Sequence, residues 1–206
     1  MFALVESGSI TKMLNGNKGI TLNDLQYPRA IYTLWTEAER NAIGIYSIVY
    51  DDTNKKDERW YINTNQSFAF ADNKVTATYG SATAKAHADT NFTAQEETDG
   101  LGTEGDVASR GLKYNYKTTI NQKAAGVLQD TDWMVVRAAE GGTAVPSAIT
   151  TWRAAVRTKA NAMQVQIDGA ADVDALAALY AYTYADPDDL TSALTRPLGE
   201  FPVLGA

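Results

Sequence analysis

The stretch LQDTDWMVVRAAE, residues 128–140, sets the organisation of the C-terminal half of the chain. Asp130 or Thr131 suits the N-cap of a short helix that carries Trp133, because a side-chain oxygen there can accept a free amide N–H of the first turn. Two glycines follow this stretch at once and favour a left-handed stop. The stretch therefore predicts a short helix with a defined start and end.

Apolar patterns on both sides of this stretch predict two longer helices. Upstream, apolar residues recur every three or four positions from Leu112 to Leu128 and make one stripe. Downstream, Pro146 suits the first turn of a helix, where its missing N–H is not needed, and the apolar pattern continues to Ile167. Asp172 predicts the cap of a short third helix. Because the connection between the long helices is short, we expect them to pack as an antiparallel pair.

The first 85 residues are rich in Ile, Tyr, Thr, Val and Asn and in turn dipeptides, which is typical of strands. Phe2–Val5 and Ile10–Leu14 predict a hairpin. Thr36 and Glu39 have the spacing of a capping box and predict a short helix that ends near Gly44. Further strands are predicted at Ala30–Trp35, Ile45–Tyr50, Trp60–Thr64, Ser67–Ala71 and Lys74–Tyr79.

The chain is therefore expected to have an α+β fold. We predict a small N-terminal antiparallel β module with a short helix at residues 1–85 and an acidic flexible linker at 86–105. A C-terminal α-helical hairpin domain at 106–182 and an extended proline-containing tail at 183–206 follow. The linker is predicted because residues 86–106 hold six acidic residues and no Lys or Arg. Such a composition buries too little apolar surface to offset the entropy of ordering.

Composition excludes several classes of protein. A length of 206 residues suffices for one sizeable core or two small domains, and a net charge of -7 argues against a dedicated duplex nucleic-acid binder. The absence of cysteine excludes disulfides, thiol catalysis and thiolate metal sites. The short apolar run at Met1–Val5 lacks a basic leader, and no apolar stretch approaches the roughly 20 residues that cross a bilayer. We expect a soluble protein, made in a cytoplasm, with no membrane partner.

No constellation of residues indicates catalysis. His87 is the only histidine and lies in a polar stretch, so a surface position is expected rather than a catalytic or metal-binding one. The acids at residues 186–189 lack the glycine and terminal glutamate of a calcium loop. Gly100–Gly105 has the spacing of a dinucleotide fingerprint, but acidic residues stand where a buried strand should precede it. The sequence thus predicts no enzyme, no metal and no cofactor.

Aromatic residues allow two interpretations. Trp133 and Trp152 occur at core periodicity, and packing in the core is expected for both. Trp60 and Tyr61 point to opposite faces if they lie on a strand, so one of them is expected to be exposed. Together with Tyr79 they are the basis for a possible carbohydrate-binding surface.

Charged residues near residues 128–140 are expected to form structural pairs. Arg137 and Glu140 share a helix face at a spacing of three, and Arg153 and Arg157 share one at a spacing of four. Pairing of Arg137 or Arg153 with Glu140 or Asp132 would hold helix turns by charge-assisted hydrogen bonds.

The ordered series of these residues resembles a domain of tailed bacteriophages. Its members are Thr131-Asp132-Trp133, Arg137, Glu140, Pro146, Arg153 and Arg157. The domain is found in tail-fibre assembly proteins and related tail-associated proteins, and the likeness spans roughly residues 106–168. The N-terminal half is similar in style to the small β-rich leaders of phage tail proteins, with Gly44-Ile45-Tyr46 in the position of a characteristic strand.

The resemblance implies a non-enzymatic structural protein of the virion, such as a tail, baseplate or fibre-associated subunit. It would be made in the host cytoplasm and act in the tail through contacts with other phage tail or fibre proteins, as a homo-oligomer within an assembly. The expected interaction residues are Trp133, Arg137, Glu140, Trp152, Arg153 and Arg157. The alternative is a tail-fibre assembly chaperone that the particle does not retain, and a third hypothesis is a host-facing carbohydrate-binding module.

Overall fold

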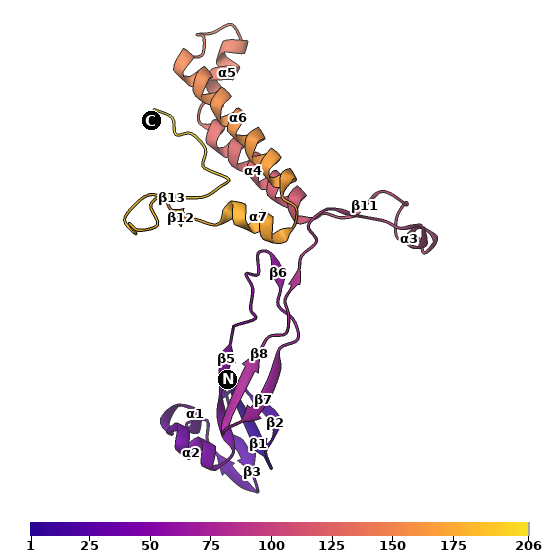
Figure 1. Ribbon diagram of the computed structural model, residues 1–206, viewed down its shortest axis with the longest axis vertical. Helices are drawn as coiled ribbons and strands as arrows, with labels where there is room; N and C mark the ends of the chain where they lie inside the picture. The colour runs from indigo at the N-terminus through magenta and orange to yellow at the C-terminus, as the bar shows by residue number, and fades with distance from the viewer. Residues whose placement is uncertain (206) are drawn as a thin grey trace. The chain divides into compact units, whose positions relative to one another are not determined.

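The computed structural model describes residues 1–205 and divides them into two compact units, the first being Met1–Thr83 and the second starting at Ala84 (Figure 1). Strands dominate the first unit and the long helices belong to the second. The predicted α+β class, with an N-terminal sheet rich in antiparallel pairs and helices towards the C-terminus, is confirmed.

The first unit is built on a five-stranded sheet with the order β2-β1-β5-β8-β7. Its strands are β1 (Phe2–Glu6), β2 (Ser9–Leu14), β5 (Ile45–Asp51), β7 (Ser67–Ala71) and β8 (Lys74–Thr78). The predicted hairpin at the start of the chain is confirmed as β1 and β2. Neighbouring strands are antiparallel except β5 and β8, which run parallel, a feature that the sequence pattern did not indicate.

Shorter elements complete the first unit. They are β3 (Ile20–Leu22), β4 (Leu25–Tyr27), α1 (Ile31–Leu34), α2 (Glu37–Ala42) and β6 (Tyr61–Ile62). The short strand β9 (Thr83–Ala84) spans the boundary between the units. The strand predicted at Ala30–Trp35 was wrong, since α1 occupies this stretch. Both Ile31 and Tyr32 are buried there. A strand would send neighbouring side chains to opposite faces, whereas a helical turn can bury both on one side.

Two apolar clusters cover the two faces of the five-stranded sheet. On one face, all five strands contribute to a cluster of Ala3, Val5, Ile10, Tyr46, Ile48, Phe68, Phe70, Val75 and Ala77. The edge strands β2 and β7 approach each other, so the sheet curls around this cluster. On the other face, Ile31 and Tyr32 of α1 pack with Leu4, Leu14 and Ile45.

The short helix α2 matches its prediction. Thr36 and Glu39 form a reciprocal capping box, in which the Thr36 side chain accepts from the Glu39 backbone and the Glu39 carboxylate accepts from the Thr36 backbone at 2.7 Å. Gly44 follows with a φ of +79°, and a Cβ at this position would lie 2.6 Å from the carbonyl oxygen of Val5. Only glycine therefore allows β5 to begin so close to β1.

The second unit contains four helices that the sequence pattern anticipated in order. They are α4 (Leu112–Gln129), α5 (Asp132–Ala139), α6 (Ser147–Gly169) and α7 (Val173–Tyr180). Pro146 is the N-cap of α6 and lies one residue before its first turn. The Asp172 carboxylate caps α7 by accepting from the Ala175 amide at 2.8 Å, as predicted.

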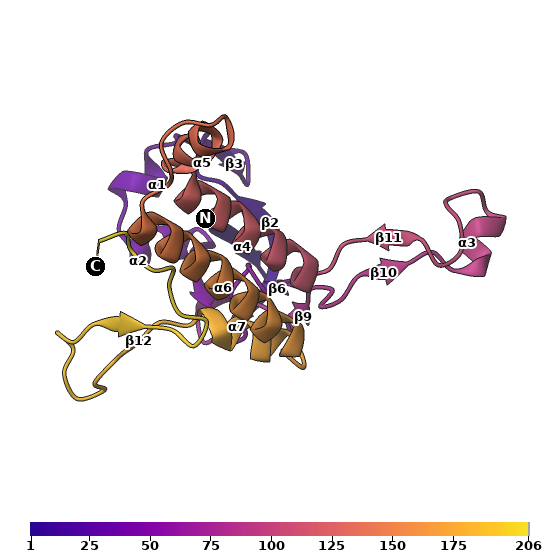
Figure 2. The ribbon, with the colours of Figure 1, turned by 90° about the horizontal axis from the view of Figure 1, so that it is seen from above.

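Helices α4 and α6 lie side by side and run in opposite directions (Figures 1 and 2). Their apolar stripes meet, and the most deeply buried side chains are Ile120, Val156, Met163 and Ile167. Polar contacts fix the register of the two helices along one edge. Gln164 donates to Asn121 at 2.9 Å, and Lys117 pairs with Asp168 at 2.8 Å.

The acidic segment near the start of the second unit has secondary structure of its own, contrary to the prediction of a flexible linker. It contains β10 (Thr90–Asn91), α3 (Ala94–Thr98) and β11 (Val107–Ser109), and β10 pairs with β11. We call residues 88–110 the arm; it extends away from the start of α4 (Figure 2). Local hydrogen bonds order the arm even though little apolar surface is available.

The C-terminal segment returns to the helices instead of remaining free. It forms a small hairpin of β12 (Thr183–Tyr184) and β13 (Leu194–Thr195). Leu198 is fully buried, and its amide donates to the Leu179 carbonyl at 3.1 Å. Within residues 1–205, none of the helices has the length and apolar character that crossing a membrane requires.

Candidate interaction site

Arg153 of α6 holds the start of α5 in place. Its side chain is only 12% exposed. The guanidinium donates to the Leu128 carbonyl at 2.9 Å, to the Thr131 hydroxyl at 2.5 Å and to the Asp132 carboxylate at 2.7 Å. Of the pairs considered from the sequence, the one between Arg153 and Asp132 is confirmed. One side chain thus joins the end of α4, the turn after it and the first residue of α5; we call α5 with this anchoring region the corner.

Thr131 takes the N-cap position of α5 but does not cap it with its side chain. The Thr131 hydroxyl instead donates to the Leu128 carbonyl at 2.9 Å while it accepts from Arg153. Thr131 is only 3% exposed, and is the one polar residue that the described part of the chain buries to this degree. The predicted capping bond was wrong because the arginine, distant in sequence, gives the hydroxyl a different role.

The apolar face of α5 is directed to solvent. Trp133 is 56% exposed and Val136 is 54% exposed, so the expected core position of Trp133 was wrong. The guanidinium of Arg137 lies 4.8 Å from the centre of the Trp133 ring, which is a favourable cation–π arrangement. The core periodicity of α5 is real, but α4 and α6 do not cover that side of the helix.

Arg137 and Glu140 do not form the expected pair: no ion pair between them occurs in the part of the chain that the structure describes. Glu140 is exposed at the end of α5. Gly141 has a φ of +84°, as the left-handed stop predicts, and the Gly142 amide donates to the Arg137 carbonyl at 2.9 Å. Arg137 prefers the Trp133 ring, which leaves the Glu140 carboxylate in solvent.

The other two expected residues lie on α6. Arg157 is exposed, and its guanidinium makes no hydrogen bond or ion pair with any residue from 1 to 205. Trp152 is half-buried, and its indole N–H donates to the Pro202 carbonyl at 2.9 Å. Of the six expected residues, Trp133, Glu140 and Arg157 are thus exposed and Arg137 is half-buried. The other two, Arg153 and Trp152, are anchors.

Replacing Trp152 by phenylalanine is expected to loosen the C-terminal segment. The ring is kept but the donor to Pro202 is lost, and one such bond contributes about 1 kcal/mol. Hydrogen exchange of the Leu198 amide should become about fivefold faster, since local opening of the segment exposes this amide. The matched control is Trp133→Phe, because Trp133 is exposed on α5 and its indole makes no hydrogen bond to the segment within residues 1–205. An unchanged exchange rate in Trp152→Phe would contradict the anchoring role.

A carboxylate fixes the base of the arm. Asp89 accepts from the Gly111 amide at 2.8 Å and from Arg110 at 2.6 Å. The hydrogen bond from the Gly111 amide has the largest effect and the one from Arg110 the next largest, and both lower the pKa of Asp89 below its ordinary value. Because the pKa of Asp89 is lower in the folded state, its hydrogen bonds stabilise the fold fully when the pH is above the unfolded pKa of about 3.9. This stabilisation is lost as the pH falls through the folded pKa.

A pH titration followed by NMR at the Gly111 amide is therefore expected to show a midpoint below about 3.9. Asp89→Asn should abolish this transition while leaving the rest of the spectrum unchanged. A midpoint at or above the ordinary value would mean that Asp89 does not hold the arm.

The aromatic residues considered for sugar binding do not form an open platform. Trp60 is 3% exposed and Tyr61 is 8% exposed, so the expectation that one of them is exposed was wrong. Lys56 lies over the Tyr61 ring at 4.1 Å and Lys55 over the Tyr79 ring at 5.7 Å. Strand β6 is only two residues long, so the alternation on which the expectation depended does not develop.

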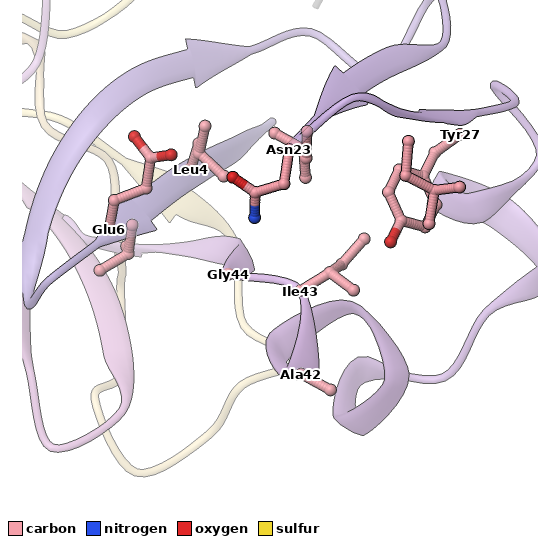
Figure 3. A pocket seen from close by; sticks show the side chains of 10 residues that line it. Leu4, Glu6, Asn23, Tyr27, Ala42, Ile43 and Gly44 are labelled. Atoms are coloured by element: carbon pink, nitrogen blue, oxygen red, sulfur yellow. The ribbon is translucent and has the colours of Figure 1, made fainter.

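A shallow pocket of the first unit, shown in Figure 3, has a volume of about 380 Å³. Leu4, Tyr27 and Ile43 line it, and its polar side chains include Glu6 and Asn23. The Glu6 carboxylate already accepts from Thr11 at 2.7 Å. Among the residues that line this pocket there is no histidine, and Glu6 is the one carboxylate.

His87 is less exposed than expected. The residue is half-buried beside the start of α4, where its carbonyl accepts from the Lys113 amide at 3.0 Å. Burial, together with the nearby charge of Lys113, lowers the pKa of His87. No group of three or more potential metal ligands is found among the described residues. The corner, and not His87, is therefore the candidate site.

Two features of the second unit were not predicted from the sequence. Thr93 and Glu96 form a second capping box, at the start of α3. The spacing T-x-x-E is present in the sequence and could have predicted this helix. No local pattern could have predicted the contact between Arg153 and Thr131, which are 22 residues apart.

Comparisons of the chain with protein-family models, with curated proteins and with solved structures find no match.

Proposed function

We propose that this chain is a non-enzymatic structural protein of a bacteriophage tail, where it acts as a tail, baseplate or fibre-associated subunit through protein–protein contacts. One observation supports the proposal most directly. The stretch that resembles phage tail-associated proteins also forms the corner, where Trp133 is 56% exposed on an anchored helix. Large exposed aromatic side chains beside an arginine are typical of the residues that dominate protein interfaces.

In this proposal the parts of the chain have separate docking roles. The helical hairpin of α4 and α6 presents the corner, and the acidic segment at residues 86–105 reaches a neighbour. The two-unit organisation suits a connector, because each unit has its own core and its own surface. The partners would be other tail or fibre proteins, and the activity would require no cofactor and no nucleic acid.

The proposal is tested by mass spectrometry of particles purified from a phage that encodes this chain. We expect the protein at a fixed copy number relative to known tail subunits, and enriched in tails separated from capsids. A chain that is abundant in the infected cell but missing from purified particles would overturn the proposal.

The alternative is a tail-fibre assembly chaperone, which also uses exposed apolar surface but leaves after assembly. Co-expression with the fibre protein of the same phage distinguishes the two. A chaperone would make the fibre soluble and trimeric and then be absent from the purified fibre. A structural subunit would remain bound, and its corner variants Trp133→Ala and Val136→Ser would reduce its incorporation.

A further inference from the structure

A second pocket of the first unit is lined by residues 12–20 and by Tyr32 of α1; we call it the loop pocket. Its volume of about 250 Å³ is below the roughly 300–1,000 Å³ of pockets for drug-sized ligands. The charged side chains that line it are those of Lys12 and Lys18, and no acid is among its lining residues. The pocket in Figure 3 differs, since Glu6 is the charged side chain there. In a chain of net charge -7, the loop pocket is a local basic site.

Residues 15–19 form one wall of the loop pocket, and their backbone amides have no acceptor. This stretch bends without a hydrogen-bonded turn, and its amides donate to no atom of residues 1–205. Gly16 has a φ of +68°, in the left-handed region. Successive N–H groups in a turn that includes a left-handed residue form concave sites for anions. The wall therefore offers free donors to a negatively charged ligand.

Two close contacts hold residues 15–19 in shape before any ligand binds. A Cβ on Gly16 would lie 3.1 Å from the Phe2 ring and 3.3 Å from the Tyr32 ring. A Cβ on Gly19 would lie 2.5 Å from the Tyr27 carbonyl oxygen. Because glycine allows both approaches, the stretch is packed against the unit at two points. Such a preformed loop loses little conformational entropy when a ligand binds.

Tyr32 adds a hydroxyl donor to the loop pocket. The residue is only 7% exposed, yet its hydroxyl makes no hydrogen bond within residues 1–205. The hydroxyl is not sealed in the core, because the fully enclosed side-chain atoms without a partner in this range belong to other residues. Burial raises the pKa of Tyr32, so the hydroxyl keeps its proton at neutral pH. Since Tyr32 lines the loop pocket, a ligand there would supply the partner that a buried tyrosine usually has.

The strand register directs Lys12 to the face of the sheet on which Tyr32 packs. Lys12 is paired with Leu4 across β1 and β2, and directly paired residues point to the same face. Leu4 belongs to the apolar cluster that includes Tyr32. Both Lys12 and Lys18 are exposed, and neither makes an ion pair within residues 1–205. Two ammonium groups are therefore available to a ligand of the loop pocket.

The acids nearest in sequence do not neutralise these lysines. Glu6 and Asp24 are the acids among residues 1–36. The Glu6 carboxylate accepts from Thr11 at 2.7 Å and lines the pocket in Figure 3. Asp24 lies in the turn of the β3–β4 hairpin, whereas residues 15–19 adjoin the opposite end, where Ile20 pairs with Tyr27. The positive charge of the loop pocket is thus uncompensated by these two acids.

We propose that the loop pocket binds the phosphate group of a small molecule. The groups that recognise it are the amides of residues 15–19, the ammonium groups of Lys12 and Lys18, and the Tyr32 hydroxyl. A phosphate group has several oxygens that accept in different directions, whereas the two oxygens of a carboxylate lie in one plane. Donors from a loop, a strand and a helix therefore suit phosphate better. This inference does not depend on the tail function, because it concerns the purified chain alone.

An NMR titration of the purified full-length protein with inorganic phosphate tests the proposal. The ionic strength is kept constant, so that screening does not change during the titration. We expect saturable shifts of the amides of residues 15–19. The amides of residues 22–25, at the pocket in Figure 3, should stay unchanged and are the internal control.

Glycerol phosphate distinguishes the possible sources of the phosphate group. Tighter binding than that of inorganic phosphate supports the proposal and identifies an organic monoester as the ligand. Equal binding also supports it and shows that the pocket recognises the phosphate group alone.

Substitutions assign the individual contacts. Lys12→Gln and Lys18→Gln are each expected to weaken phosphate binding about fivefold or more, because hydrogen bonds to charged groups contribute more than neutral ones. Tyr32→Phe keeps the ring and should weaken binding about threefold. The matched control is Lys74→Gln, which removes the same charge from an exposed position of β8 outside the loop pocket and should leave the affinity almost unchanged. Circular dichroism of each variant checks that the fold is kept.

Three results would overturn the proposal. The first is the absence of saturable shifts at residues 15–19 in tens of millimolar phosphate. The second is an equal loss of affinity in Lys74→Gln and Lys12→Gln, which would indicate a general effect of charge. The third is binding of acetate, a carboxylate, as tight as that of phosphate. Absence of the protein from phage particles would instead remove the tail function and leave the phosphate site standing.

Discussion

Replacing Ile167 by alanine is expected to lower the free energy of unfolding of the helical unit by about 3 kcal/mol, within the range of roughly 2–5 kcal/mol for such truncations. Ile167 is fully buried near the end of α6. The substitution removes apolar contacts and leaves a cavity that rigid neighbouring helices cannot fill. Urea unfolding followed by circular dichroism at 222 nm reports this unit, because the long helices belong to it.

The same helix provides the control. Val165 lies two residues earlier and is 71% exposed. Val165→Ala is expected to change the unfolding free energy by less than about 0.5 kcal/mol. Similar losses for the two substitutions would contradict the assignment of the buried face of α6.

Replacing Arg153 by alanine is expected to destabilise the corner by about 2–3 kcal/mol, since hydrogen bonds to a charged group contribute more than neutral ones. The variant loses the bonds from the guanidinium to Leu128, Thr131 and Asp132. Because the side chain is only 12% exposed, water replaces these bonds poorly. The measurement is again unfolding in urea, combined with hydrogen exchange of the α5 amides, which should accelerate more than those of α4.

Arg157 is a matched control for this second substitution. It lies one turn further along the same helix and is exposed. Arg157→Ala removes the same type of side chain and the same charge, yet it is expected to cost less than about 0.5 kcal/mol. Equal losses at the two positions would show that net charge, and not the anchoring contacts of Arg153, is responsible.

Much of the local structure was predictable because it depends on neighbouring residues. The capping box of Thr36 and Glu39 and the cap at Asp172 require only a suitable side chain three residues from an amide. The hairpin of β1 and β2 similarly follows from two apolar runs separated by a turn. The helices α4 and α6 were predictable because their apolar stripes continue over many turns.

The errors came from long-range packing. Trp133 has a core spacing on α5, but no other element covers that side of the helix, and the sequence of α5 does not contain this information. Residues 86–105 have the composition of a linker, yet Asp89, the Thr93 cap and the Phe92 ring over Gly102 order them locally. Composition is an average over a segment, whereas these contacts depend on single residues at particular positions.

The candidate site was predicted in part. Its residues were identified from the series around Trp133, and the pair of Arg153 with Asp132 was among those considered. The division of that series into an anchor and an exposed surface was not predictable, because it depends on which side of α5 meets α6. The parallel pairing of β5 with β8 was not predictable for a similar reason. Period-two alternation shows which face of a strand is buried, but it does not show which strand pairs with it.

The inner position of β1 in its sheet has a consequence for synthesis on the ribosome. Residues 2–6 are made before either neighbouring strand, and because they lie between β2 and β5 they cannot acquire both neighbours until residue 47 has been made. The remaining strands of this sheet end at Thr78, before any residue of the long helices. The first unit can therefore complete its fold while the second is still being translated, in the order usual for multi-unit chains.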